Sequence, residues 1–268
     1  MDFAYVIAGS EATGGAGLQA DLKTFQQLGV YGIGTITCIV SFDPKAGWAH
    51  RFRPVAPEII EEQFEAANAS QDLDTVKIGM LGTPETIAAV ARAVGSKTWR
   101  HVVLDPVLIC KGQEPGAALN TDNALRAEIL PLASVVTPNN FEARALAQLD
   151  SLDTVDDLAE AGRRIIRLGP GAAVVKGGID FPGPDAVDVL VQRDPAGGEP
   201  TVEVFAVPKI GQERVSGAGC TFASAVTAEL AKGASVSDAV RAAKAFTTRG
   251  IERRVSGHTP FDTVWQGA

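Results

Sequence analysis

Small residues and one cysteine lead directly into an Ala-rich segment near the C-terminus, at residues 215–221 with the sequence VSGAGCT. Glycine lets the backbone turn tightly and approach a ligand closely. The first turn of a helix carries unpaired N–H groups and a partial positive charge, which together receive phosphate or a developing oxyanion. A helix start also favours the thiolate of a cysteine such as Cys220. The pattern predicts phosphoryl transfer, with a plain strand-to-helix turn and a buried cysteine as the alternative.

Two charged residues stand where apolar segments of strand length end. Asp105 follows one such segment and precedes Pro106, and Lys176 ends another before two glycines. A carboxylate is costly to bury unless it is paired or meets a cation. Asp105 is therefore expected near a phosphate or metal site, or else as the cap of a turn. Lys176 is expected at the nucleotide side of a site, or else as a solvated lysine at a strand end.

Asn139 and Glu142 lie three residues apart at the predicted start of a helix, so both side chains can face the same way. A carboxylate and an amide oxygen suit Mg²⁺, which takes few protein ligands and keeps several waters. The same spacing fits a capping box, in which Asn139 caps the helix and Glu142 closes the box. Both roles can hold together.

Two further loops contain candidate residues. Residues 9–17 combine glycines with small polar side chains, and either approach a ligand or form a plain strand-to-helix turn. In the second case Asp21 and Lys23 after them are simply solvated charges. Residues 109–116 form a Gly- and Pro-containing loop with Cys110 beside Lys111, which suits a mobile lid carrying a thiol of raised thiolate character, or an incidental surface thiol. Cys38, inside a β-branched segment, is expected in the core.

Composition excludes several classes of function. The 268 residues carry a net charge of −8, which argues against a nucleic acid or an anionic membrane as the main partner. An odd count of three cysteines without a CxxC pair indicates a reducing, cytoplasmic setting rather than a disulfide framework. No segment reads as a signal peptide or a transmembrane helix. The three histidines show no metal-ligand spacing, so no zinc site is expected.

Strand-length apolar segments alternate with helical patterns, which predicts an α/β fold with a mostly parallel sheet covered by helices on both faces. We expect one domain over residues 1–268. Strands are expected at 4–8, 34–40, 75–78, 101–105, 134–137 and 172–176, followed by an antiparallel pair at 185–192 and 201–207. Helices are expected after residue 17, at 57–69, 85–94, 124–132, 141–148, 155–168 and 237–255, and from the 217–220 loop through Leu230. Ligands of such folds bind beyond the carboxyl ends of the strands.

Together these segments resemble the ribokinase-like superfamily, and within it the vitamin kinases that act on pyridoxal and on hydroxymethylpyrimidine or its phosphate. The resemblance spans essentially the whole chain. It rests on IAGSEATGGAGLQADLKTF at 7–25, KIGMLG at 77–82, DPV at 105–107, TPNNFEA at 137–143, KGG at 176–178 and GAGCTFASA at 217–225. It implies a ribokinase-like three-layer α/β/α fold, ATP with Mg²⁺ as phosphoryl donor, and a homodimer.

The resemblance also implies roles for individual residues. Gly217, Ala218 and Gly219 match the anion hole, and Cys220 stands where sugar kinases of the superfamily have their catalytic Asp. Asn139 and Glu142 match positions that act on Mg²⁺ and phosphate. Asp105 and Lys176 match positions near the nucleotide phosphates, with Asp105 also a candidate for the metal.

Further residues bear on the second substrate. Ser10 and Gly17 match substrate-binding positions, although Glu11-Ala12-Thr13 departs from the GSDS-like loop common in the group. Phe42 occupies the position at which pyrimidine kinases have a Gln that reads the aminopyrimidine edge, and a phenyl ring can only pack or stack there.

Cys110, with Lys111 and Gly112, resembles the lid cysteine of pyridoxal kinases that have two cysteines. In that subgroup the lid thiol is thought to add to the substrate aldehyde, which implies a small lid around residues 106–120. The sequence thus predicts an ATP-dependent pyridoxal kinase. The alternatives are a hydroxymethylpyrimidine or hydroxymethylpyrimidine-phosphate kinase, and a weakly catalytic protein that binds B6 vitamers.

Overall fold

Nine strands form one sheet in the order β3-β2-β1-β4-β5-β6-β7-β8-β9. The computed structural model describes residues 1–108 and 115–267. The strands are β1 (Phe3–Glu11), β2 (Tyr31–Asp43), β3 (Ala49–Pro54), β4 (Thr75–Ile78), β5 (His101–Leu104), β6 (Val135–Val136), β7 (Ala172–Lys176), β8 (Asp185–Gln192) and β9 (Thr201–Pro208). Strands β2, β1, β4, β5, β6 and β7 run parallel, whereas β3, at one edge, and the β7-β8-β9 pairings are antiparallel.

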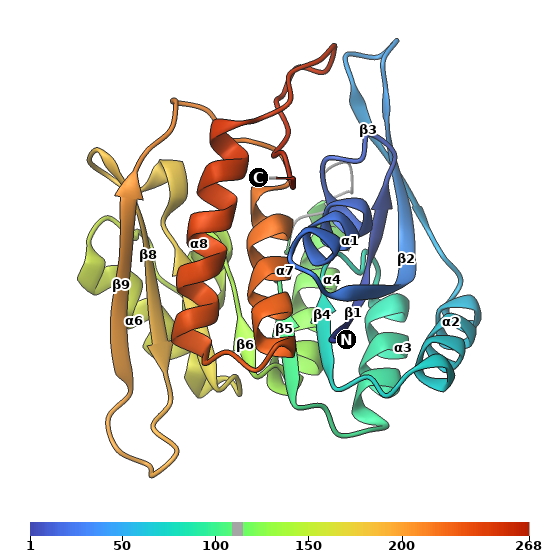
Figure 1. Ribbon diagram of the computed structural model, residues 1–268, viewed down its shortest axis with the longest axis horizontal. Coiled ribbons are helices and arrows are strands. Elements are labelled where there is room, and N and C mark those ends of the chain that lie inside the picture. Colours follow the sequence, from blue (N-terminus) through green and yellow to red (C-terminus); the bar gives the residue numbers. More distant parts are fainter. Residues whose placement is uncertain (109–114, 268) are drawn as a thin grey trace.

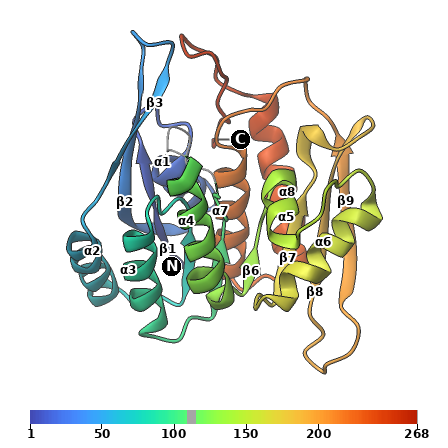
Figure 2. The same ribbon diagram turned by 180° about the vertical axis from the view of Figure 1, so that it is seen from behind.

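Helices cover both faces of this sheet. They are α1 (Gly17–Gln27), α2 (Pro57–Ser70), α3 (Pro84–Gly95), α4 (Pro115–Ala124), α5 (Asn140–Ala147), α6 (Val155–Arg167), α7 (Ala218–Ala231) and α8 (Val236–Glu252). Helices α1, α7 and α8 lie on the face seen in Figure 1, and α3, α4, α5 and α6 lie on the opposite face seen in Figure 2. The predicted three-layer α/β/α fold with a mostly parallel sheet is therefore confirmed. No helix in the described ranges has the length and apolarity needed to cross a bilayer.

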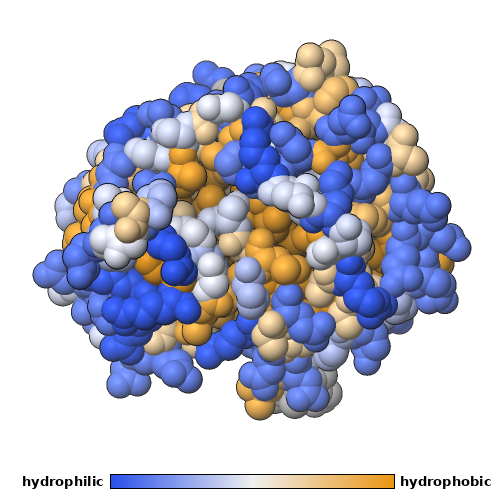
Figure 3. Space-filling model, turned by 90° about the horizontal axis from the view of Figure 1, so that it is seen from below, coloured by the Kyte–Doolittle hydropathy of each residue, from blue (hydrophilic) through white to orange (hydrophobic). Residues whose placement is uncertain are grey.

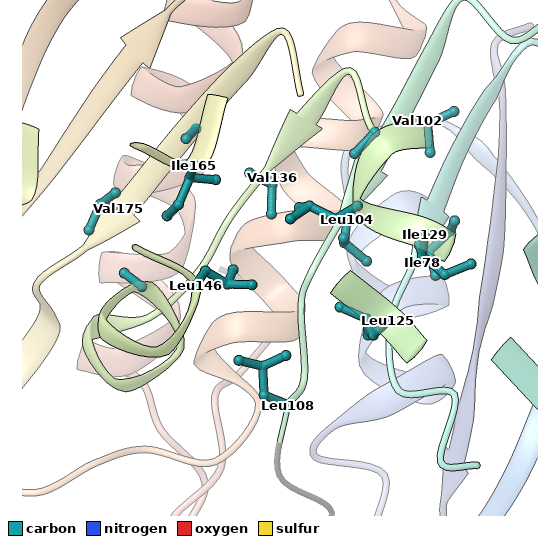
Figure 4. Close-up of a cluster of buried hydrophobic side chains, with 14 of the residues drawn as sticks. Ile78, Val102, Leu104, Leu108, Leu125, Ile129, Val136, Leu146, Ile165 and Val175 are labelled. Carbon is teal, nitrogen blue, oxygen red and sulfur yellow. The ribbon is translucent and has the colours of Figure 1, made fainter. Parts of the chain in front are cut away.

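The central strands are apolar because helices cover both of their faces. All four residues of β4 are buried, as are most residues of β1 and β5. A large core cluster fills the space between the sheet and α3, α5 and α6, and ten of its members are labelled in Figure 4. They are Ile78, Val102, Leu104, Leu108, Leu125, Ile129, Val136, Leu146, Ile165 and Val175. From below, polar residues dominate the periphery of the surface and hydrophobic residues show toward its middle (Figure 3).

The order of the strands determines where a ligand can bind. Strand β1 lies between β2 and β4; it leads into α1 on one face, whereas β4 leads into α3 on the other. The pairing of β1 with β2 shifts register between Ala8 and Ser10, where the chain turns toward the residue 9–17 loop. In open α/β sheets, ligands bind at such switch points, beyond the carboxyl ends of the strands.

Three parts of the predicted organisation differ from the structure or fall partly outside the described residues. Strand β2 extends to Asp43 and forms a hairpin with β3. Strand β3 was not predicted from the sequence, because residues 49–54 show no clear alternation of apolar and polar residues. Of the predicted lid at 106–120, residues 109–114, with Cys110, lie outside the described residues, and α4 begins at Pro115. The predicted 124–132 helix is a π-helical turn over Leu125–Ile129 followed by a 3₁₀ turn, because Pro131 cannot continue the ladder.

Candidate active site

A cavity of about 510 Å³ lies at the carboxyl end of the sheet, between the starts of α5 and α7 and the ends of β7 and β9. It brings together most of the residues expected from the sequence at the phosphates and the metal. These are Asp105, Asn139, Glu142, Lys176, Gly217, Ala218, Gly219 and Cys220. The remaining candidates Ser10, Gly17 and Phe42 do not line this cavity, and Cys110 lies outside the described residues.

Helix α7 opens toward this cavity at Gly217. Gly217 adopts the left-handed conformation with φ of 81°, and a β-carbon there would overlap the carbonyl oxygen of Gly15. Only glycine meets both conditions. No side chain of the described residues caps α7, so its first N–H groups stay available for an anion. A β-carbon on Gly219 would lie 3.6 Å from Lys176 Nζ, which places that cation beside the helix start.

The loop before α7 is held by the C-terminal segment. Ser216 donates its N–H to Asp262 O (2.9 Å) and accepts the N–H of Val264 (3.0 Å). Gln266 Nε2 lies 3.4 Å from Gly15 O and 3.3 Å from Thr221 Oγ1. Three segments far apart in sequence, the 9–17 loop, the 215–221 loop and residues 262–266, therefore meet around the start of α7.

Cys220 faces the cavity from the first turn of α7, and the backbone N–H of Gly17 donates to its sulfur. Burial raises the pKa of the thiol to about 12; the positive charge of Lys77 is the largest opposing effect. The prediction that the helix start lowers this pKa is therefore wrong, since desolvation outweighs the helix dipole here. Cys220 rests as a thiol, and its thiolate depends on nearby positive charge.

Asp105, which follows β5, and Lys176, at the end of β7, form a largely buried ion pair across β6. Lys176 Nζ lies 3.5 Å from Asp105 Oδ1, and their side chains are 11% and 5% exposed. The backbone fixes Lys176 through its N–H to Pro138 O, at 2.9 Å. Both residues line the cavity, and neither is a solvated strand-end charge. Their roles toward a nucleotide or a metal stay predictions.

Glu142 and Asn139 form the capping box of α5. Asn139 N donates to Glu142 Oε2 at 2.8 Å, and Glu142 N donates to Asn139 Oδ1 at 2.9 Å. Burial first, and then the charge of Asp105, raise the pKa of Glu142 to about 8, against the opposing effect of Lys176. Two adjacent buried carboxylates gain from a divalent cation between them. This donor set fits Mg²⁺, which needs few protein ligands. No group of three or more His, Cys, Asp or Glu in the described residues, this site included, could hold a metal. A cation here would therefore rest on these two carboxylates and water.

The raised pKa of Glu142 predicts a pH-dependent stability. The folded state keeps this proton between pH 4.5 and about 8, where the unfolded chain has lost it. The contribution of protonated Glu142 to the free energy of unfolding is therefore present at low pH. As pH rises through that window, ~2–4 kcal/mol of this free energy is lost. Glu142→Gln should remove this loss while keeping the capping box, since Gln also closes it. Urea unfolding of both proteins at pH 5.5 and 8.5, without Mg²⁺, measures this loss. An equal change in the free energy of unfolding between the two pH values in both proteins would contradict the prediction.

The predicted substrate residues outside the cavity contact other parts of the protein. Ser10 Oγ accepts a hydrogen bond from Gln19 Nε2 at 2.7 Å, so it is engaged inside the protein. The Phe42 ring packs against His50 of β3, at 5.5 Å, and Phe261 of the C-terminal segment, at 5.2 Å. Gly17 contacts Cys220 as described. Their roles toward a substrate stay predictions.

Sequence reasoning missed two buried ion pairs beside the site. Asp21, for which a solvated charge was the plain alternative, is fully buried and pairs with Lys77 at 3.0 Å. Its position offered a signal, because residues 18, 21, 22 and 25 share one helical face with three apolar members. Lys244 of α8 pairs with Asp188 of β8 at 2.8 Å, and both line the cavity; a sequence separation of 56 residues gave no such signal.

The fold and this cavity define a ribokinase-like phosphotransferase. The chain belongs to the phosphomethylpyrimidine kinase family, whose model matches residues 11–262. It is 44% identical to the pyridoxine kinase of Bacillus subtilis, over 94% of this chain and 91% of that protein. It is 36% identical to the hydroxymethylpyrimidine/phosphomethylpyrimidine kinase of Haemophilus influenzae, over 95% and 93% of the two chains.

Solved structures agree with this membership. An ADP complex of Bacillus subtilis pyridoxal kinase superposes with a TM-score of 0.92 at 41% identity, covering 100% of this chain and 98% of that one. The pyridoxal kinase of Staphylococcus aureus, in complex with AMP-PCP and pyridoxal, superposes with a TM-score of 0.90 at 35% identity, covering 100% and 94%.

Proposed function

We propose that this protein is an ATP-dependent pyridoxal kinase that phosphorylates the 5′-hydroxymethyl group of pyridoxal. The observation that carries the proposal is the uncapped start of α7, which faces the cavity with Cys220 in its first turn and the Lys176–Asp105 pair beside it. The pyridoxine and pyridoxal kinases among the relatives support the choice of vitamin.

The residues of the cavity divide the work of phosphoryl transfer. The N–H groups of Gly217–Cys220 and the Lys176 ammonium stabilise charge on the transferring group, which is the main task in such reactions. Asp105 and Glu142 would hold Mg²⁺, which neutralises phosphate charge when bound. Asn139 fixes Glu142 through the capping box. Cys220, as its thiolate, accepts the proton of the substrate hydroxyl.

A hydroxymethylpyrimidine kinase is the second candidate, because relatives with that activity are 34–37% identical to this chain. Phe42 argues against it, since its ring packs on His50 and Phe261 and offers no hydrogen bond to an aminopyrimidine. A binding protein without turnover is disfavoured because the acid, lysine and glycine residues of the cavity are all in place.

Steady-state turnover of MgATP with pyridoxal and with hydroxymethylpyrimidine separates these functions. We expect the larger kcat/KM with pyridoxal. Turnover confined to the pyrimidine would make the second candidate correct. Tight pyridoxal binding without ADP formation would support the binding protein.

The lid cysteine gives a second, independent test of the aldehyde substrate. Cys110→Ala should lower kcat with pyridoxal by tenfold or more and change kcat with pyridoxine far less, because only pyridoxal has an aldehyde for a thiol to attack. Parallel assays of both vitamers on the variant and the parent measure the ratio. Equal losses with the two vitamers would remove the thiol addition.

Three further features belong to this proposal: a single domain with a lid around residues 106–120, a homodimer and a cytoplasmic location. Light scattering of the purified protein tests the dimer. The expected mass is twice the 27.9 kDa of one chain.

A further inference from the structure

A fully buried ion pair lies beneath Cys220. Lys77 of β4 and Asp21 of α1 are both 0% exposed, and Lys77 Nζ lies 3.0 Å from each carboxylate oxygen of Asp21. Ser224 of α7 donates its hydroxyl to Asp21 Oδ1 at 2.7 Å. Desolvation makes such a pair a poor source of stability compared with apolar residues of similar size. The position of the pair therefore calls for another explanation.

The pair lies one helical turn from the Cys220 sulfur. Helices α1 and α7 contact each other at two levels: Gly17 N–H donates to Cys220, and Asp21 accepts from Ser224. Gly17 and Asp21 are four residues apart, as are Cys220 and Ser224, so each pair shares a helix face. The contact of Gly17 with Cys220 holds the sulfur, and the contact of Asp21 with Ser224 holds the carboxylate that pairs with Lys77.

A glycine just beyond β4 leaves space for the Lys77 ammonium. A β-carbon on Gly79 would come within 2.8 Å of Lys77 Nζ, so glycine leaves room for the cation at the end of β4. Among the described residues, the charged groups that act most on Cys220 are Lys77 from β4, Asp21 from α1 and Asp105 from beyond β5. Both carboxylates disfavour a thiolate, and Asp105 already has Lys176 as a partner. Lys77 is the cation of this set, and its charge favours the thiolate.

We propose that Lys77 is a positioning residue for phosphoryl transfer, whose buried charge, held in place by Asp21 and Ser224, stabilises the Cys220 thiolate. This inference rests on the proposed function of Cys220 as the base. As the hydroxyl oxygen bonds to the γ-phosphorus, the bond from that phosphorus to the β–γ bridging oxygen breaks and ADP leaves. The hydroxyl proton passes to the Cys220 sulfur. Lys77 keeps its protons and exchanges none.

The test removes both charges together, so that no buried charge remains unpaired. In the Lys77→Gln, Asp21→Asn variant two amides can still bond to each other and to Ser224. Alkylation by iodoacetamide, followed on the Cys220 peptide by mass spectrometry across pH, reports the thiolate without any substrate. We expect at least a tenfold slower alkylation at pH 9, a lower kcat for pyridoxal that recovers toward high pH, and an unchanged KM for ATP.

A matched control is the other buried pair, Lys244 and Asp188. The Lys244→Gln, Asp188→Asn variant should leave the alkylation profile of Cys220 unchanged, since neither residue is among the charges that act on this thiol. If the Lys77→Gln, Asp21→Asn variant has the alkylation profile of the wild type, the inference is wrong, whatever the effect of the two substitutions on stability. If the Lys77→Gln, Asp21→Asn variant does not fold, the Lys77→Met, Asp21→Leu variant replaces it, and the same slower alkylation of Cys220 is expected.

The outcomes for the two proposals are distinguishable. Slower alkylation in a protein that does not phosphorylate pyridoxal supports the link between Lys77 and Cys220 and contradicts the proposed substrate. Normal pyridoxal turnover with an unshifted profile supports the proposed function and contradicts the role of Lys77.

Discussion

Replacing Cys220 by alanine is expected to lower kcat for pyridoxal by about 10²- to 10⁴-fold, the range over which a general base contributes. The sulfur faces the cavity, and the N–H of Gly17 and the charge of Lys77 both act on it. The alanine variant keeps the anion hole, so ATP should bind with nearly unchanged affinity. Quenched-flow formation of pyridoxal 5′-phosphate measures the chemical step, and isothermal titration with a non-hydrolysable ATP analogue measures binding.

Cys38→Ala is the control for this experiment. Cys38 is a fully buried thiol in β2, outside the residues that line the cavity. Its replacement should lower stability by a small amount and leave kcat intact. More than a tenth of the wild-type kcat in Cys220→Ala would mean that another group, or water, takes the proton.

Gly217→Ala is expected to damage both the fold and the phosphate site. The new β-carbon would overlap Gly15 O, and the left-handed backbone at this residue disfavours alanine in any case. The start of α7 must shift, which displaces the N–H groups that receive phosphate. The loss of one such donor lowers kcat by about 10²- to 10³-fold, and the overlap should lower the free energy of unfolding by ~2 kcal/mol or more.

The other end of the same helix supplies the comparison. Gly233, just beyond α7, also has a positive φ, of 94°, but nothing lies within 4 Å of its β-carbon position. Gly233→Ala should therefore lose only ~1–2 kcal/mol from backbone strain and keep full kcat. Thermal unfolding and steady-state kinetics of both variants separate strain from damage to the site. Equal kcat in the two variants would contradict the role of the Gly217 turn.

Much of the fold followed from local patterns. The apolar run at Thr75–Ile78 and the antiparallel pair β8–β9 lie as expected, because buried strands and turn residues leave clear local signals. Strand β3 was not predicted, since its sequence AHRFRP has Phe52 as its one large apolar residue and its half-buried positions include a histidine, His50. Helix α4 was not predicted either, because it begins in a Gly- and Pro-containing segment that is typical of a loop. Its sequence is also only weakly amphipathic.

The site divides in the same way. Asp105, Lys176 and Gly217 were predictable because each stands at a strand end or a helix start, where chain direction alone brings them together. The pKa of Cys220 was not predictable, because it depends on burial and on Lys77, a residue 143 positions away that only the packed sheet brings near. Long-range desolvation and pairing leave no mark in a local window.

The contacts of the C-terminal segment also have a consequence for how the site forms during synthesis. Asp262 and Val264 hold Ser216, and Gln266 reaches back to Gly15. The ribosome releases a chain from its N-terminus onward, so the early glycine loop emerges long before the residues that hold it. A nascent chain still lacking residues 262–266 can form most of the sheet but not a finished phosphate pocket. We therefore expect nucleotide to stabilise this protein fully only after those residues have emerged.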